Sequence, residues 1–204
     1  MQLDSLPSSL PAKPWDLESV IATGELEQRR NRTVDWKSES DAMLQLTQEL
    51  AKSPHDFFQK LVDMVLKLSS ADSAGISLLD KKSGRFVWPA VAGGLVPYVG
   101  GGTPADFGPC GTVLDRNKPL LFVHPERHFT YLQPILPPLE EVLLIPFHVD
   151  EKPVGTIWAV IHNPDRRFQS EDRRLLENLS AFAASAYKVL ARVGALEPLL
   201  SRKA

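Results

Sequence analysis

Cysteine is almost missing from this sequence, because Cys110 is the single one among 204 residues. One thiol cannot form a disulfide within the chain, and such scarcity is typical of a reducing compartment. Long apolar runs are missing too, since no stretch approaches the roughly 20 residues that a membrane-spanning helix requires. Residues 1–14 lack the basic and apolar segments of a secretory signal. We therefore expect a cytoplasmic protein without membrane contact.

An excess of charge of one sign is also lacking. The chain has 23 basic and 25 acidic residues, which gives a net charge of -2. This balance indicates neither nucleic-acid binding nor attraction to an anionic membrane. The hydrophobic fraction of 43% is ordinary for a globular protein with a sizeable core.

The patterns that are present divide the chain into three parts. Residues 1–36 combine prolines and serines with a charged stretch, which predicts a flexible arm with a helical turn around 16–22. Residues 37–195 form the predicted domain, and residues 196–204 form a C-terminal tail.

Hydrophobic spacing within the domain predicts helices at both ends and strands between them. Helical spacing runs over 41–67 and again over 170–192, where the apolar stripe consists of Leu175, Leu179, Phe182, Ala186 and Leu190. Shorter apolar runs separated by turns predict hairpins over 75–91 and 142–161 and a strand at 120–123. This order predicts an α+β fold, in which a central antiparallel sheet carries the terminal helices, packed together, on one face.

The opposite face of the predicted sheet is left to irregular segments. Residues 92–110 are rich in glycine, residues 124–141 are irregular as well, and a short helix is expected at 111–117. Long irregular segments in a compact domain are usually functional or disordered. We expect these segments and the short helix to cover a pocket.

Four local patterns, in this order, resemble the GAF domain family over about residues 41–192. They are ADSAGISLLD at 71–80, GPCGTVLDRNKP at 108–119, VLLIPFH with PVGTIW at 142–158, and RFQSED at 167–172. The resemblance implies a GAF-like fold and a sensory or regulatory role.

A narrower resemblance is to GAF domains placed ahead of bacterial sensor histidine kinases. It is carried by TGEL at 23–26, the arginines at 29, 30 and 32, PCGTVL at 109–114 and HPERH at 124–128. It implies a role in a two-component system with a sensor kinase partner. The chain has no phosphoacceptor helix and no ATP-binding glycine boxes, so if it is complete it would sense without its own output domain.

The pocket candidates are aromatic, basic and thiol side chains of the strands and irregular segments, since pockets combine apolar walls with a few polar groups. They are Trp88, Tyr98, Phe107, Cys110, Arg127, His128, Tyr131 and Trp158. The two tryptophans have the ordinary alternative of packing in the core. The sequence does not identify a ligand or a cofactor.

Cys110 is the main candidate for chemistry. It precedes a short predicted helix, whose N-terminus can lower the pKa of a thiol. Its Gly-Pro-Cys-Gly setting resembles free methionine-sulfoxide reductases of the GAF fold, but those enzymes use further cysteines and the segment 124–141 contains none. Glycine follows Cys110, whereas histidine commonly follows the cysteine that attaches a bilin in phytochrome-like GAF domains.

Other chemistry is weakly supported. His124 and His128 have a spacing that suits a metal on a helix, but no third ligand follows. The glycines at 100–102 lack the Lys-Ser/Thr of a phosphate-binding loop, and the motif of cyclic-nucleotide-binding GAF domains is missing. We therefore expect no catalytic residues and no metal site.

The sequence leaves three hypotheses. The first is a sensory module that binds a small ligand or partner and signals through its terminal helices as a homodimer. The second is a redox enzyme that uses Cys110, and the third is a ligand-free scaffold that dimerises. A dimer built on the 170–192 stripe requires that stripe to be exposed in one subunit.

Overall fold

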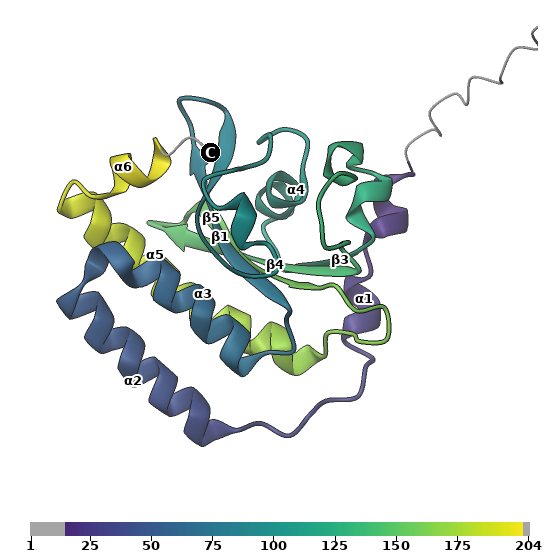
Figure 1. Ribbon diagram of the computed structural model, residues 1–204, viewed down its shortest axis with the longest axis horizontal. Helices are drawn as coiled ribbons and strands as arrows, with labels where there is room; N and C mark the ends of the chain where they lie inside the picture. Colours follow the sequence, from purple (N-terminus) through teal and green to yellow (C-terminus); the bar gives the residue numbers. More distant parts are fainter. Residues whose placement is uncertain (1–14, 202–204) are drawn as a thin grey trace, which may run out of the picture.

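The fold is built on a five-stranded antiparallel sheet with the strand order β2-β1-β5-β4-β3 (Figure 1). The computed structural model describes residues 15–201. The strands are β1 (Ser73–Asp80), β2 (Arg85–Gly93), β3 (Leu120–Val123), β4 (Glu141–Val149) and β5 (Lys152–Ile161). Both predicted hairpins are present, and the pairing of β1 with β5 joins them. The prediction of an α+β fold on an antiparallel sheet is confirmed.

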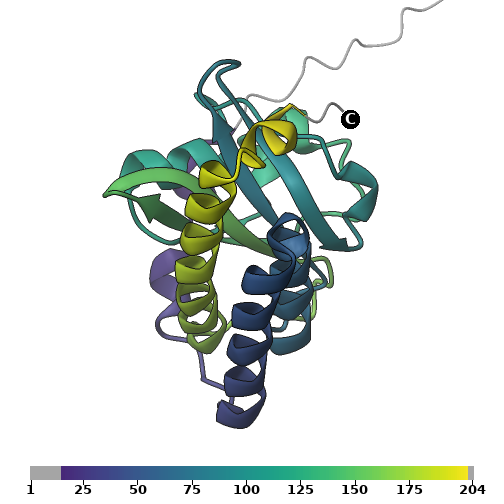
Figure 2. The same ribbon diagram turned by 90° about the vertical axis from the view of Figure 1, so that its left-hand side faces the viewer.

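Three long helices lie together on one face of the sheet (Figures 1 and 2). They are α2 (Trp36–Lys52), α3 (Phe57–Leu68) and α5 (Ser170–Arg192). α3 packs on β1 and β2, α5 packs on β4 and β5, and α2 packs on α3. α2 begins earlier than the expected residue 41 because the Asp35 carboxylate accepts a hydrogen bond from the Ser38 backbone N–H at 3.0 Å.

The other face carries short elements. They are η3 (Val96–Tyr98), α4 (Pro109–Arg116), η4 (Pro125–Arg127) and η5 (Thr130–Leu132). The segments expected to be irregular therefore contain three single turns of 3₁₀ helix. α4 begins two residues before the predicted helix because Pro109, which has no N–H to satisfy, occupies its first turn.

Strand residues alternate between two hydrophobic clusters, one on each face of the sheet, as the two-residue period of a strand requires. Ile76, Leu143 and Ile157 belong to the cluster under the helices. Trp88 and Trp158 belong to the cluster on the α4 face. The sheet thus separates a structural helix layer from a layer of short segments.

The apolar stripe of α5 packs against the hydrophobic core of its own chain. Leu175, Leu179, Ala186 and Leu190 are fully buried, and Phe182 is partly buried against the same cluster. The predicted packing between the terminal helices is present as contact between α3 and α5. This stripe therefore offers little apolar surface to a second subunit.

Residues 15–35 pack against the domain, unlike the flexible arm expected from their composition. They contain η1 (Leu17–Val20), which matches the expected turn, and α1 (Thr23–Leu26). Val20 is buried in the cluster on the α4 face and Leu26 in the cluster under the helices. Because these two apolar anchors lie on opposite faces, the segment must pass around the edge of the sheet. We call residues 15–35 the strap.

The predicted N-terminal arm and C-terminal tail extend beyond the described residues. The prediction for residues 1–14 lies outside the described residues, as does that for 202–204. Within the expected tail, α6 (Leu196–Leu200) is helical, and Leu196 is buried against the cluster under the helices.

Candidate functional site

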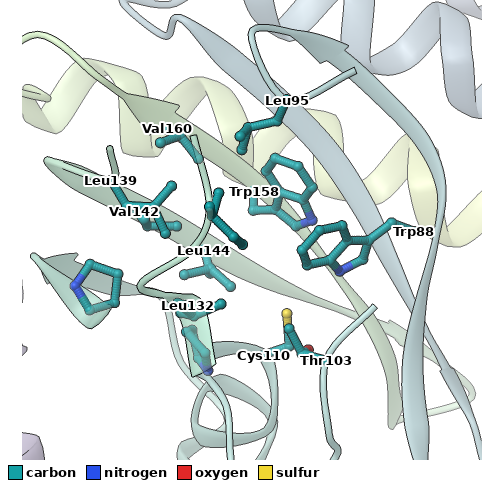
Figure 3. A pocket seen from close by; sticks show the side chains of 13 residues that line it. Trp88, Leu95, Thr103, Cys110, Leu132, Leu139, Val142, Leu144, Trp158 and Val160 are labelled. Atoms are coloured by element: carbon teal, nitrogen blue, oxygen red, sulfur yellow. The ribbon is translucent and has the colours of Figure 1, made fainter. Parts of the chain in front are cut away.

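A small cavity lies between the sheet and the short segments of the α4 face (Figure 3). Its volume is about 50 Å³, which is room for a few water-sized groups. The walls are largely aliphatic and aromatic, and no charged side chain lines them. The lining residues include Trp88, Thr103, Cys110, Leu132, Val142 and Trp158.

The two tryptophans form one wall of this cavity. Their ring centroids are 5.6 Å apart at an interplanar angle of 62°, an edge-to-face contact. Trp158 on β5 lies over Gly75, its partner on β1, where an added Cβ would be 2.1 Å from the indole ring. The Trp158 Nε1–H donates to Ser77 Oγ at 3.0 Å. Glycine at position 75 and a serine two residues later therefore fix the position of this ring.

Cys110 lies at the first turn of α4 beside the tryptophans. Its Sγ donates to Ser77 Oγ at 3.3 Å and accepts from Thr156 Oγ1 at 3.5 Å. Burial raises the pKa of the Cys110 thiol, and the hydrogen bonds offset this only in part. The pKa of Cys110 is therefore raised and not lowered as its place before a helix suggests, because the thiol is removed from water.

Two polar atoms at the cavity have no partner. Trp88 Nε1 and Thr103 Oγ1 are buried, and neither makes a hydrogen bond within residues 15–201. Thr103 lies close to Cys110 and Tyr131 but meets hydrogen-bond geometry with neither. Buried polar groups of a folded protein are normally paired. Three other unpaired atoms, Arg32 Nε, Glu126 Oε2 and Gln169 Oε1, belong to residues that do not line the cavity.

Three of the eight candidate residues, Trp88, Cys110 and Trp158, line the cavity. Tyr98 packs against the same hydrophobic cluster and holds a covering segment, because its hydroxyl accepts a hydrogen bond from the Leu136 N–H at 2.9 Å. The Tyr131 hydroxyl lies near Gly108, the residue before α4, and burial raises the pKa of its phenol.

The other three candidates lie outside the cavity. Phe107 is 44% exposed and packs against His128, with ring centroids 5.5 Å apart. Both line a separate surface hollow next to Asp106. Arg127 places its guanidinium 4.7 Å from the ring centroid of Trp15. These side chains therefore stabilise the surface and the strap and do not face the cavity.

Sequence reasoning missed Thr103 and the aliphatic wall, which includes Leu132, Leu139, Val142 and Leu144. The strand alternation does carry a signal for part of it. Leu144 pairs with Trp158 and Val142 pairs with Val160 across β4 and β5, so the four side chains share one face. Thr103 and Leu132 lie in irregular segments, where no periodicity reports which way a side chain points.

The glycine cluster has a structural use. Residues 100–103 run beside β2, with hydrogen bonds from Gly100 N to Trp88 O at 2.8 Å and from Trp88 N to Gly101 O at 2.9 Å. A Cβ on Gly102 would lie 1.8 Å from the Phe86 carbonyl oxygen. Glycine is required here for close backbone approach, and this contact places Thr103 at the cavity.

The strap connects the cover of the cavity to the helix layer. At its start, Trp15 N donates to Arg127 O at 3.0 Å, and Trp15 O lies 2.6 Å from His128 Nδ1. Pro125, in the same turn as Arg127, lines the cavity. The first end of the strap is thus attached to the η4 segment that covers the cavity.

At its other end the strap is held by ion pairs between partly exposed arginines and buried carboxylates. The Arg29 guanidinium makes two hydrogen bonds of 2.8 and 2.9 Å to the Glu141 carboxylate, which is completely buried. Arg32 pairs with Asp172 at 3.2 Å in the first turn of α5. Charge-assisted pairs with this bidentate geometry are strong. The arginines therefore fasten the strap to β4 and α5 before it continues into α2.

Metal and membrane features are not apparent in the described part of the chain. Among residues 15–201, no three His, Cys, Asp or Glu side chains are grouped as a metal site would require. None of the helices in that range is both long and apolar enough to cross a bilayer.

Comparison with known proteins identifies the family. A family model described as GAF domain matches residues 51–187, more than half of the chain. The chain belongs to the GAF domain family. No protein of curated function matches the sequence.

Solved structures share the fold at low sequence identity. A GAF domain of a phosphoenolpyruvate-protein phosphotransferase from Acinetobacter is 23% identical with a TM-score of 0.65, covering 76% of this chain and 95% of that one. Its counterpart from Coxiella burnetii is 18% identical with a TM-score of 0.66, covering 79% and 99%. A free methionine-R-sulfoxide reductase from Neisseria meningitidis, in complex with its substrate, is 13% identical with a TM-score of 0.60, covering 81% and 98%.

Proposed function

We propose that this chain is a sensory or regulatory GAF domain in signal transduction, which binds a small ligand in the cavity and transmits binding through its terminal helices. The observation that carries the proposal is the apolar cavity between the sheet and the α4 face, walled by Trp88, Trp158 and aliphatic side chains. Small-molecule sites are usually concave and lined mainly by apolar and aromatic side chains, as this cavity is.

The strap supplies a route for the signal. Its first end is bonded to Arg127 and His128 beside the cover of the cavity. Its second end is ion-paired to Glu141 and Asp172 and leads directly into α2. A ligand that favours one position of the cover would shift the strap and the helices with it, because a ligand acts by its different affinity for two arrangements.

Native mass spectrometry of the chain purified from its own host tests the ligand proposal. We expect a reproducible bound small molecule on the wild-type protein and its loss from Val142→Phe, which fills the cavity. Val193→Phe is the matched control, because Val193 is 60% exposed and lies after α5, away from the cavity. A molecule retained by Val142→Phe would place the site elsewhere, and its absence from every preparation would favour a ligand-free scaffold.

A redox enzyme is the second candidate, favoured by one observation: Cys110 borders the cavity in a fold shared with a free methionine-R-sulfoxide reductase. We propose that the chain is not an enzyme of this kind, because its thiol is held neutral by burial and no other cysteine exists in the chain to resolve an oxidised one. Incubation of the wild-type chain with free methionine-R-sulfoxide and a dithiol reductant should give no more methionine than Cys110→Ser. Turnover that requires Cys110 would reverse this proposal.

A further inference from the structure

The described walls of the cavity, which include the covering segment 125–139, expose no polar atom to the space inside. The indole nitrogen of Trp88 and the hydroxyl of Thr103 are covered by neighbouring atoms. The Trp158 N–H and the Cys110 thiol are hydrogen-bonded to strand hydroxyls that do not line the cavity. The polar groups among these side chains are therefore withheld from anything that enters.

Water is a poor occupant of this space. A buried water needs about two to four polar partners, and the described walls offer it none. The volume of about 50 Å³ is nevertheless several times what one water requires. Protein interiors keep few empty spaces of this size, because the atoms that line them lose packing contacts. An apolar group is the occupant that restores those contacts.

The aliphatic walls come from both layers of this face (Figure 3). Val142 and Leu144 belong to β4, whereas Leu132 lies in η5 and Leu139 in the residues that lead into β4. An aliphatic group in the cavity would contact the sheet and the covering segment at once. Its binding would therefore favour the arrangement in which the cover lies against the sheet.

We infer that the part of the ligand that enters the cavity is a compact aliphatic group of about three or four carbon atoms that carries no polar atom. It packs against Leu132, Val142 and Leu144. A polar or charged group placed among these walls would lose its hydration and gain no partner, so any such part of the ligand lies outside the cavity. This inference rests on the proposed ligand-binding function and adds the chemical class of the buried group.

Propane and dimethyl ether test the inference on the full chain, because they differ only in a central CH₂ group or oxygen. Each gas is dissolved at a series of partial pressures, and binding is followed by the ¹H–¹³C methyl resonances. We expect propane to shift the methyls of Leu132, Val142 and Leu144 to saturation. Dimethyl ether should bind at least about tenfold more weakly, since its oxygen is buried without a hydrogen bond. The methyls of Leu44, which is 59% exposed on α2, are the internal control and should not move.

Two substitutions at Val142 change the size of the cavity in opposite directions. Val142→Phe fills it and should abolish the propane shifts, whereas Val193→Phe, at a residue that is 60% exposed, should keep them. Val142→Ala enlarges the cavity. Neopentane, with five carbons, should therefore bind this variant at least about fourfold more tightly than wild type, which is the contribution of one buried methylene. The second substitution gives a result even if Val142→Phe does not fold.

The outcomes separate this inference from the proposed function. Dimethyl ether bound as tightly as propane would overturn the aliphatic class and leave a ligand cavity of another selectivity. Propane shifts that persist in a folded Val142→Phe, or that extend to Leu44, would overturn the inference by placing binding outside the cavity, as would an unchanged affinity of Val142→Ala for neopentane. Absence of saturable shifts with both gases would overturn the cavity as a ligand site, and with it the proposed function.

Discussion

Gly75 shows how one residue positions the wall of the cavity. The Trp158 indole occupies the space that a side chain at position 75 would need, since an added Cβ would lie 2.1 Å from the ring. Gly75 on β1 is therefore required because Trp158 on β5 packs over it. From the sequence alone, a glycine at this position indicates only a destabilised strand.

We expect Gly75→Ala to lower the free energy of unfolding by about 1–3 kcal/mol, the usual cost of overpacking, and to alter the near-UV circular dichroism of the tryptophans. Urea unfolding gives the first quantity. Gly24→Ala is the matched control, because nothing lies within 4 Å of its added Cβ; this variant should be neutral or slightly stabilised. An unchanged stability of Gly75→Ala would show that Trp158 can move aside.

Cys110 gives a prediction on pH. Its pKa is raised in the folded chain by burial, so the unfolded chain releases this proton first. The stability that the neutral thiol contributes is therefore complete below the ordinary thiol pKa of 9.0 and is lost as the pH rises above it. We expect wild type to lose more stability than Cys110→Ser between about pH 8 and about pH 10.5 in urea unfolding.

Two tyrosines also bear on that experiment. Burial raises the pKa of Tyr131 and Tyr187. The effect of Tyr187 cancels in the comparison of wild type with Cys110→Ser, whereas the pKa of Tyr131 is also raised by the charge of Cys110 and adds to the loss in wild type. Parallel curves for the two proteins would mean that the thiol is ionised in the fold. The same raised pKa predicts slow alkylation of Cys110 by iodoacetamide at neutral pH until the chain is unfolded.

At the scale of elements, the strap depends on the pair between Arg29 and Glu141. Glu141 is completely buried, and it also accepts a hydrogen bond from the Phe168 N–H at 2.8 Å. Arg29→Met would leave this carboxylate without its main partner. We expect a loss of about 3 kcal/mol in the free energy of unfolding and faster hydrogen exchange over residues 15–35.

Lys82→Met is the matched control for the strap. Lys82 pairs with Glu197 at 3.2 Å, but both side chains are largely exposed, so little stability should change. If Arg29→Met exchanges no faster than Lys82→Met over the strap, then the apolar anchors Val20 and Leu26 hold this segment without the ion pair.

The elements also show what could be predicted from the sequence. The helical spacing of Leu175 and Leu179 and the alternation around Trp158 are local patterns, and the helices and hairpins that they predict are present. The strap could not be predicted in this way. Arg29 pairs with Glu141, which lies 112 positions further along the chain. The segment is also mostly polar, so its two buried apolar residues, Val20 and Leu26, give no regular pattern.

The cavity residues were harder to predict than the helices and strands, because contacts between distant residues leave no local sequence pattern. Trp88, Cys110 and Trp158 were found because tryptophan and cysteine stand out in any sequence. Phe107 and His128 were expected at the pocket but lie at the surface, because side-chain direction in an irregular segment follows from its tertiary contacts.

At the scale of the whole molecule, the dimer and the sensor kinase partner stay predictions. With the α5 stripe buried, a helix-based dimer would have to use the outer side of α2, where Trp36 and Leu44 are exposed. We expect sedimentation equilibrium to show a dimer for wild type and a monomer for Leu44→Glu. Val99→Glu, at an exposed residue of the opposite layer, is the control; a wild-type monomer would contradict the prediction.

Parts of both margins of the sheet are covered by the chain itself. At β3, Ala22 N donates to Leu121 O at 2.9 Å and Leu121 N donates to Thr23 Oγ1 at 3.0 Å. At β2, residues 100–103 pair with the outward-facing backbone groups of Phe86 and Trp88. An open strand edge is a template for adding strands from another molecule, which leads to aggregation. The strap and the glycine segment thus protect the molecule from fibril-like growth, and they direct any association with another protein to helices or loops.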